Sequence, residues 1–400
     1  MMVRFGIGLR LTAVASMVLA VGCTAAREDA APPSASGASI AQGVASRFPE
    51  PGAGPFPPDR VAALQAVLDG AVRAHAFFAG SGAPGVTAAV LTDQGSWMGA
   101  AGIGGDGRLL VPEAMMGIAS ISKTFTAAEV LHLAAAGRVD LDAPMSNYVE
   151  HRLTSNGATV RETLGMRSGI RFHEPDTLAM LGAVFAAPGR HWTPQDSLAY
   201  QKGTPSAPGG APAYSDANYW LLGLLVEKVT GRSLAQALRA DLLDPAGLDR
   251  VAVQDAERPT PPLGAPPSQL RLEPDGYLPC RALATAGGAA GGMAADAPTL
   301  ARWGYQLYGA RLLPAETVHT MMTPESAGTV FPERTVGYGL GTMLFLDVGT
   351  ETTVGHSGQS PAYSSMLAVI PARHLSAAIP IPDEERDTYA VMADLFAAMR

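Results

Sequence analysis

Strand-like segments near both ends of the folded part, separated by a long helical stretch, constrain the fold of this chain most. Near the N-terminal end, residues 85–92 and 96–102 flank Asp93-Gln94-Gly95 and predict a β-hairpin. Strand composition returns after about residue 335. The segments concerned are 336–348, 351–354, 364–370 and 375–381, with a closing helix at 388–399. A sheet formed from both ends of the chain predicts an α+β fold.

The expected architecture is an antiparallel β-sheet flanked by helices, with a largely α-helical inserted domain. The α/β part covers about 58–125 and 297–400, and the α part about 126–296. Between the strand segments, caps and apolar spacing predict helices. These begin near Asp59, at the capping box Thr159 to Glu162, and at 218–229, 233–243 and about 300–308.

The first 57 residues have the composition of an export signal and a tether. Residues 1–22 contain Arg4 and Arg10 followed by an apolar stretch too short to span a bilayer, and small residues precede Cys23. This pattern resembles a bacterial lipoprotein signal, in which Cys23 is lipidated. An ordinary secretory signal cut nearby is the alternative. Residues 23–57 are rich in Ala, Pro, Ser and Gly and predict a flexible linker between the lipid anchor in the bacterial cell envelope and the folded domain.

Composition excludes some classes of protein. The 400 residues are 47% hydrophobic and 16% charged, with a net charge of −8, and no basic run indicates nucleic-acid binding. The chain has two cysteines, Cys23 and Cys280, so a lipidated Cys23 leaves no intramolecular disulfide. No His-Glu-x-x-His or paired-cysteine spacing indicates a metal, and no cofactor is expected.

Ser120-Ile121-Ser122-Lys123 is the strongest candidate for catalytic chemistry. It follows the apolar run Met115 to Ala119 and starts a segment with helical spacing, so Ser120 and Lys123 should share one helix face. A serine nucleophile needs a base, and lysine can serve when its pKa is lowered. Only three lysines occur, Lys123, Lys202 and Lys228, while arginine, which does not deprotonate, supplies the other cations.

Two further motifs follow in order, Tyr214-Ser215-Asp216 and His356-Ser357-Gly358. Together with Ser-x-x-Lys, their order and spacing resemble the serine β-lactamase-like family. That family includes class C β-lactamases, D-Ala-D-Ala carboxypeptidases and related esterases. The resemblance covers about residues 58–400. The chain has no Gly-x-Ser-x-Gly motif, which argues against an α/β-hydrolase.

The resemblance implies a role for each motif. Ser120 would be the acylated nucleophile, with Lys123 and Tyr214 sharing the general-base work. The backbone N–H groups of Ser120 and Gln359 would form the oxyanion hole. Asp216, His356, Ser357 and Gly358 would contact the substrate.

Two departures from the family pattern bear on the substrate. Asp216 replaces an amide residue of β-lactamases, so it can accept but not donate hydrogen bonds and should hold the Lys123 ammonium tightly. His356 replaces the lysine of class C β-lactamases. If its protonated form bound a substrate carboxylate, KM would rise as the pH passed the histidine pKa.

The sequence therefore predicts an exported serine hydrolase that works through an acyl-enzyme on Ser120. A D-Ala-D-Ala carboxypeptidase-like peptidase acting on peptidoglycan stem peptides is the leading form. A carboxylesterase or a β-lactamase of the same family is an alternative. A non-catalytic, lipid-anchored penicillin-binding or sensing protein is the rival from another class.

Overall fold

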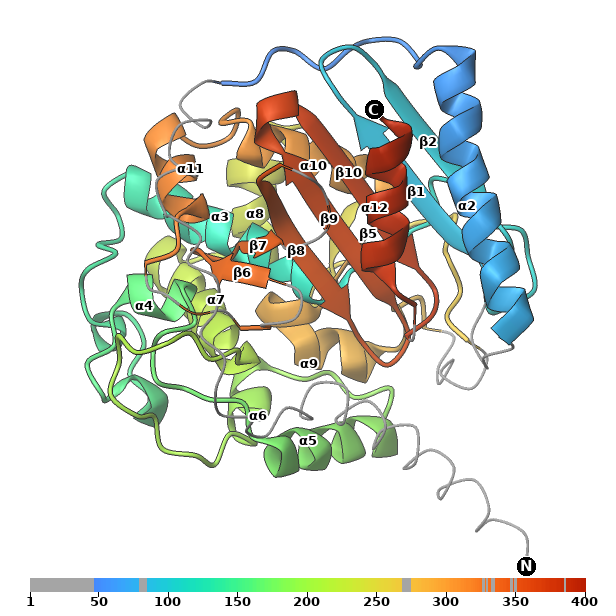
Figure 1. Ribbon diagram of the computed structural model, residues 1–400. Coiled ribbons are helices and arrows are strands. Elements are labelled where there is room, and N and C mark those ends of the chain that lie inside the picture. The colour runs from blue at the N-terminus through green and yellow to red at the C-terminus, as the bar shows by residue number, and fades with distance from the viewer. Residues whose placement is uncertain are drawn as a thin grey trace, which may run out of the picture.

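A sheet of seven antiparallel strands forms the centre of the protein. The computed structural model describes residues 47–78, 85–267, 275–325, 328, 330–331, 335–345, 348, 351–384 and 386–400. The strand order is β2-β1-β10-β9-β8-β7-β6 (Figure 1). The strands are β1 Val86–Leu91, β2 Ser96–Ala101, β6 Thr335–Tyr338, β7 Met343–Phe345, β8 Thr353–Gln359, β9 Ser364–Ile370 and β10 Leu375–Ile381. The fold class expected from the sequence is thus confirmed.

Strands from distant parts of the chain pair next to the β2 edge of this sheet. Strand β1 pairs with β2 on one side and with β10 on the other, with Ala89 opposite Ala378. Every residue of β9 and β10 is buried. Their near-continuous apolar sequences fit strands covered on both faces.

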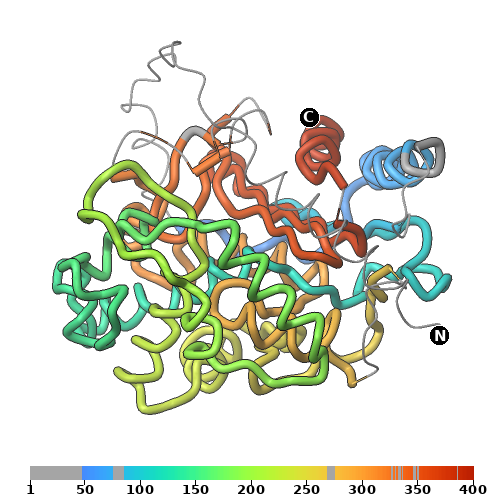
Figure 2. Tube along the Cα trace, turned by 90° about the horizontal axis from the view of Figure 1, so that it is seen from below, coloured from blue at the N-terminus to red at the C-terminus, as the bar shows by residue number. Residues whose placement is uncertain are grey.

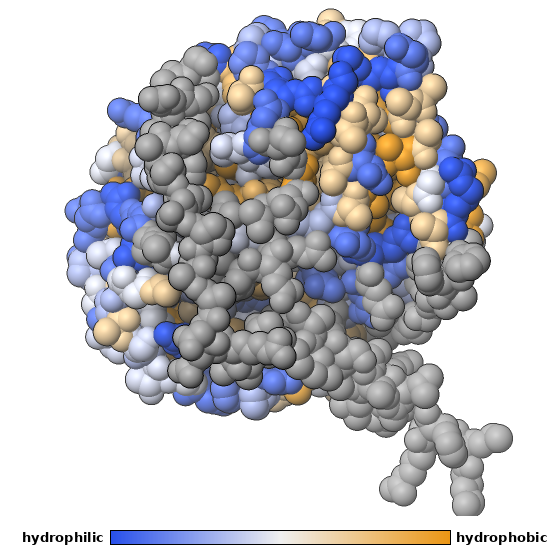
Figure 3. Space-filling model, in the orientation of Figure 1, coloured by the Kyte–Doolittle hydropathy of each residue, from blue (hydrophilic) through white to orange (hydrophobic). Residues whose placement is uncertain are grey.

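Helices cover both faces of the sheet. The first face carries α2 Pro58–Phe78 and α12 Thr388–Ala398, which contact each other. The second face carries α10 Ala297–Tyr308, with the inserted helical part beyond it (Figure 2). In Figure 3 blue polar residues surround apolar ones at the upper right, where Figure 1 places α2 and α12.

The inserted part contains α3 Ser122–Ala135, α4 Val160–Leu164, α5 Glu174–Ala186, α6 Pro194–Leu198, α7 Asp216–Thr230, α8 Leu234–Leu238 and α9 Arg281–Gly291. After α10, α11 Ala315–Met322 leads back to the sheet. A second, three-stranded sheet joins β3 Met116–Gly117, β5 Met293–Ala295 and β4 Val251–Val253. The expected capping box is present at α4, where Thr159 and Glu162 cap each other.

Three expected elements differ from the structure. Residues 336–348 form a hairpin of β6 and β7 instead of one strand, because Gly341 takes a φ of +77° in the connecting turn. The His356-Ser357-Gly358 motif was expected between two strands, but it lies inside β8. The helix expected over 233–243 is α8 followed by a π-helical turn at Arg239–Leu243.

Residues 47–57 belong to the folded body, although the linker was expected to extend to residue 57. Phe48 and Phe56 are buried, and Pro55 bridges to Ser96 beside β2. Burial of these two aromatic side chains fixes the segment on the domain despite its Pro- and Gly-rich composition. Cys23 and residues 1–22 lie outside the described residues. Among the described helices, none combines the length and the apolar character needed to span a membrane.

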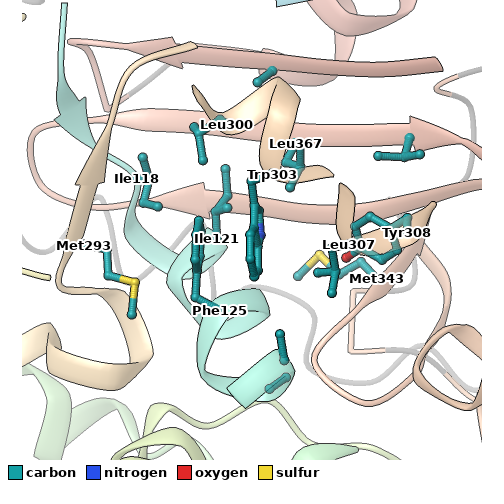
Figure 4. Packing of buried hydrophobic residues seen from close by; sticks show 14 of the residues in the cluster. Ile118, Ile121, Phe125, Met293, Leu300, Trp303, Leu307, Tyr308, Met343 and Leu367 are labelled. Atoms are coloured by element: carbon teal, nitrogen blue, oxygen red, sulfur yellow. The ribbon is translucent and has the colours of Figure 1, made fainter. Parts of the chain in front are cut away.

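The core between the sheet and the inserted part holds α3 in place. Phe125 of α3 stacks on Trp303 of α10, with ring centroids 4.0 Å apart, as Figure 4 shows. The Trp303 indole N–H donates to the Thr124 hydroxyl at 2.9 Å. Because α3 carries the Ser-x-x-Lys motif, this packing fixes the helix on which that chemistry depends.

Candidate active site

Ser120 lies in a short 3₁₀ turn, Ala119–Ile121, between β3 and α3. The residue before it, Ala119, takes a φ of +45°, an uncommon conformation for a residue with a Cβ. Ile118 is held from both sides, because its N–H donates to the Met293 carbonyl at 3.0 Å and its carbonyl accepts from the Ser365 hydroxyl at 2.9 Å. The turn leaves the Ser120 side chain partly exposed, as a nucleophile must be.

Lys123 is fully buried and makes three polar contacts. Its Nζ lies 3.0 Å from Ser120 Oγ, 2.6 Å from Asp216 Oδ1 and 2.7 Å from the Ala290 carbonyl oxygen. An ammonium satisfies all three by donation. A neutral amine satisfies the same set, because two N–H groups serve Asp216 and Ala290 while the lone pair faces the Ser120 hydroxyl. The site therefore accommodates Lys123 in both protonation states.

Burial lowers the pKa of Lys123, and the Asp216 carboxylate opposes that shift. The expected tight Lys123–Asp216 pair is present, but desolvation has the larger effect. A lysine with a lowered pKa can take a proton from serine.

The Ala290 carbonyl is a part of the site that the sequence did not indicate. Helix α9 departs from helical geometry at Gly288, and the carbonyls of Ala289 and Ala290 accept from Thr126 and Lys123 of α3. The glycine pairs at 287–288 and 291–292 are the sequence signal for such a break.

Tyr214 precedes α7 and faces the same centre. Its side chain interacts with the Ser120 hydroxyl, and the Lys123 Nζ lies 4.8 Å from its ring centroid. Burial, together with the Asp216 charge, raises the pKa of Tyr214 well above its ordinary value. Tyr214 is therefore a protonated hydroxyl, whereas the resemblance implied that it would share the general-base work with Lys123.

The structure corrects the role expected for His356. Its side chain is completely buried, and burial followed by the Lys123 charge lowers its pKa to about 3. The Nδ1–H donates to the Ser357 carbonyl at 2.6 Å, which leaves Nε2 to accept from the Tyr338 hydroxyl at 3.3 Å. A neutral ring behind Tyr214 supplies no cation for a substrate carboxylate.

Tyr338 and Tyr219 extend this buried polar network, and sequence reasoning did not single them out. The Tyr338 ring lies edge-on to both Tyr214 and His356. Tyr219 contacts Tyr338 through its hydroxyl and donates to the Leu164 carbonyl at 3.0 Å.

The end of β8 passes next to Ser120. A Cβ on Gly358 would lie 2.3 Å from the Ile118 carbonyl oxygen and 3.2 Å from the Ser120 nitrogen, so only glycine allows this approach. Gln359 follows at the end of β8 and is exposed. An oxyanion hole formed by the Ser120 and Gln359 N–H groups remains a prediction.

Ser357 is placed apart from the other candidates. Its hydroxyl accepts from Tyr389 of α12 at 3.3 Å and contacts Met343 Sδ at 3.5 Å. Alternation along β8 sends this side chain to the face opposite His356. The described contacts therefore join Ser120, Lys123, Tyr214, Asp216 and His356, and they leave the Ser357 side chain outside this group.

A partly exposed serine, hydrogen-bonded to a buried lysine and next to a tyrosine on this fold, defines a serine hydrolase of the β-lactamase-like class. The Beta-lactamase family model matches residues 66–395. The chain therefore belongs to the Beta-lactamase family.

Solved structures share this fold. A D-stereospecific amidohydrolase from Streptomyces sp. superposes with a TM-score of 0.69 at 29% identity, covering 83% of this chain and 97% of that chain. A D-amino acid amidase from Ochrobactrum anthropi SV3 superposes with a TM-score of 0.73 over 85% of this chain and 98% of that chain, and its 21% identity shows a shared fold alone.

A curated relative matches a smaller part of the chain. The D-aminopeptidase of Brucella anthropi is 31% identical over 144 residues, which are 35% of this chain and 26% of that protein. The chain thus matches about a quarter of that relative's length.

Proposed function

We propose that this protein hydrolyses amide bonds through an acyl-enzyme on Ser120. The contact between Ser120 Oγ, the buried Lys123 Nζ and the Tyr214 hydroxyl carries the proposal. The names of the similar proteins, a D-aminopeptidase and a D-stereospecific amidohydrolase, support amides or peptides of D-configured amino acids as the substrate class.

The proposed acylation uses Lys123 in its neutral form. Ser120 Oγ forms a bond to the carbonyl carbon while its proton passes across 3.0 Å to the Lys123 Nζ. The C–N bond then breaks, and the leaving nitrogen takes a proton from the Tyr214 hydroxyl. Tyr214 regains its proton from the Lys123 ammonium. In deacylation a water molecule attacks the acyl carbon and gives up a proton to the same basic groups. The C–O bond to Ser120 then breaks, Ser120 Oγ takes back a proton, and the acid is released.

A D-Ala-D-Ala carboxypeptidase would also hydrolyse a peptide of D-configured amino acids. The structure supports this activity less than the sequence did. Such a substrate ends in a carboxylate, and His356, the cation expected to bind that carboxylate, is neutral at physiological pH. An ester hydrolase or a β-lactamase would share the acyl-enzyme and differ in the group bound beside Ser120. These remain the alternatives.

Peptide-level mass spectrometry after brief exposure to an activated aryl ester tests the nucleophile. The acyl group should be found on Ser120 and should be lost in Ser120→Ala. Ser122→Ala is the matched control, because Ser122 donates to the Ala119 carbonyl inside the fold and should leave the adduct on Ser120. An adduct that survives in Ser120→Ala would contradict the assignment. An adduct that forms but does not turn over would favour the non-catalytic penicillin-binding or sensing protein.

We also propose that the protein is exported to the bacterial cell envelope and anchored in the membrane through lipid on Cys23. Replacing Cys23 with serine should move the protein from the membrane fraction to the soluble fraction. Retention of the Cys23→Ser protein in the membrane fraction would contradict the anchor.

A further inference from the structure

The carboxylate of Asp216 occupies a distinctive position beside the nucleophile. Asp216 is the first residue of α7, and its Oδ1 lies 2.6 Å from the Lys123 Nζ, which itself lies 3.0 Å from Ser120 Oγ. Lys123 is completely buried, but the Asp216 side chain is 49% exposed. The pair therefore buries its cation, while its anion, two contacts away from Ser120 Oγ, is about half exposed to solvent.

The charge of Asp216 is unbalanced in the reactive state. A base must be a neutral amine, so Lys123 then gives Asp216 a hydrogen bond but no positive charge. Tyr214 and His356, which also belong to this centre, are uncharged, because burial raises the pKa of the tyrosine and lowers that of the histidine. A cation on the substrate would restore the balance next to a carboxylate that is still partly hydrated.

Covalent geometry determines where that cation would lie. When a substrate carbonyl carbon meets Ser120 Oγ, a substituent on the neighbouring α-carbon lies ~2.5 Å from that carbonyl carbon. Asp216 is two hydrogen bonds from the same oxygen. An α-ammonium can therefore reach the carboxylate, whereas an N-acyl group would bring a carbonyl oxygen toward it. An aspartate cannot donate to that carbonyl, and the two oxygens would repel each other.

We propose that Asp216 selects substrates with a free α-ammonium on the acyl side of the scissile bond. The substrate class becomes amino acid amides and peptides cleaved after an unmodified N-terminal residue. N-acylated substrates, including the side-chain amide of a penicillin, are disfavoured. This inference rests on the proposed amide hydrolysis and specifies the end of the peptide on which it acts.

The test compares D-alanine p-nitroanilide with N-acetyl-D-alanine p-nitroanilide. The wild-type protein should favour the free amine in kcat/KM by about 100-fold, and Asp216→Asn should bring the ratio to about one or below. Loss of the Asp216 carboxylate also changes the pKa of Lys123. That change affects the hydrolysis of both substrates, so the ratio of their kcat/KM values reports the recognition of the α-amino group alone. Asp142→Asn is the matched control, because this exposed carboxylate pairs with Arg161 and should leave the ratio unchanged.

A second measurement needs no variant. The α-amino group loses its proton near pH 8, so KM of the wild-type protein should rise above that pH for the free amine and stay level for the acetylated substrate. A wild-type ratio near one, a preference for the acetylated substrate, or an unchanged ratio in a folded Asp216→Asn protein would overturn the inference alone. Failure to cleave either anilide, together with no acylation of Ser120 by the aryl ester, would overturn the proposed function.

Discussion

At the scale of single residues, the site depends on one buried amine. Lys123 is one of three lysines, and it contacts the nucleophile, a carboxylate and a helix carbonyl at once. Replacement by arginine keeps a positive charge but removes the ability to give up a proton.

Lys123→Arg should lower kcat of amide hydrolysis by at least about 10³-fold, because general-base catalysis is lost. Steady-state kinetics on an anilide substrate measure this. Lys228→Arg, near the C-terminal end of α7, is the matched control and should keep wild-type activity. An active Lys123→Arg protein would show that the base lies elsewhere.

His356 gives a second prediction at this scale. Because burial lowers its pKa to about 3, the ring stays neutral from pH 5 to 7.5, and KM for an N-acetylated peptide that ends in a carboxylate should be constant over that range. This reverses the pH dependence expected from the sequence. The KM values at several pH values decide it. A rise in KM near pH 6.5 would show that the imidazolium binds substrate.

The sequence predicted residue identities better than residue states. The motif spacing gave Ser120, Lys123 and Tyr214, and the structure brings these three into contact. The sequence could not predict the protonation states of Tyr214 and His356, because the burial that sets them depends on residues distant in the chain. The Ala290 carbonyl was missed for the same reason.

At the scale of elements, the close approach of β8 to the 3₁₀ turn at Ser120 is the critical packing contact. Gly358 has no room for a Cβ, since the Ile118 carbonyl oxygen and the Ser365 hydroxyl would lie within 2.3 and 2.5 Å of it. Both neighbours are bonded to each other, so neither can move freely.

Gly358→Ala should push β8 away from Ser120 and lower kcat at least about 100-fold, a loss comparable to that of an oxyanion donor. Gly182→Ala is the matched control, because a Cβ there meets nothing within 4 Å in α5 and alanine favours helix by ~1 kcal/mol. Activity and thermal unfolding of both variants provide the test. Full activity in Gly358→Ala would mean that β8 does not shape the site.

The prediction of secondary structure succeeded for the long apolar segments and failed at turns. Strands β9 and β10 have the bounds expected from their apolar runs. The motif in β8 was misplaced because His356, Ser357 and Gly358 have weak strand propensity, and pairing with β9 overrides it.

At the scale of the whole molecule, a buried acid couples stability to pH. Glu129 of α3 is fully buried, and burial together with the nearby Asp241 raises its pKa to about 8. Arg232 and Arg138 oppose this shift. A native pKa above the unfolded value means that the native state holds this proton more tightly.

The stability from the Glu129 proton is complete below the unfolded pKa near 4.5 and is lost as pH rises through about 8. Each pKa unit corresponds to ~1.4 kcal/mol, so the loss amounts to a few kcal/mol. Glu129→Gln should therefore reduce the fall in the free energy of unfolding between pH 6 and 9, measured by urea denaturation. Glu174→Gln, an exposed position at the start of α5, is the control. Equal pH dependence in wild type and Glu129→Gln would rule out Glu129 as the cause.

The pairing of β1 with β10 has a consequence for how the protein folds. The hairpin of β1 and β2 is local in the sequence, but β1 also pairs with β10, so that Ala89 lies opposite Ala378. Until β10 joins the sheet, the edge of β1 is open to wrong partners, which is the situation in which incompletely folded chains need a chaperone. The site at Ser120 is likewise incomplete until Gly358 and β8 pack against it. Hydrolytic activity therefore requires β8 to be in place, and its first appearance during refolding would report closure of the sheet.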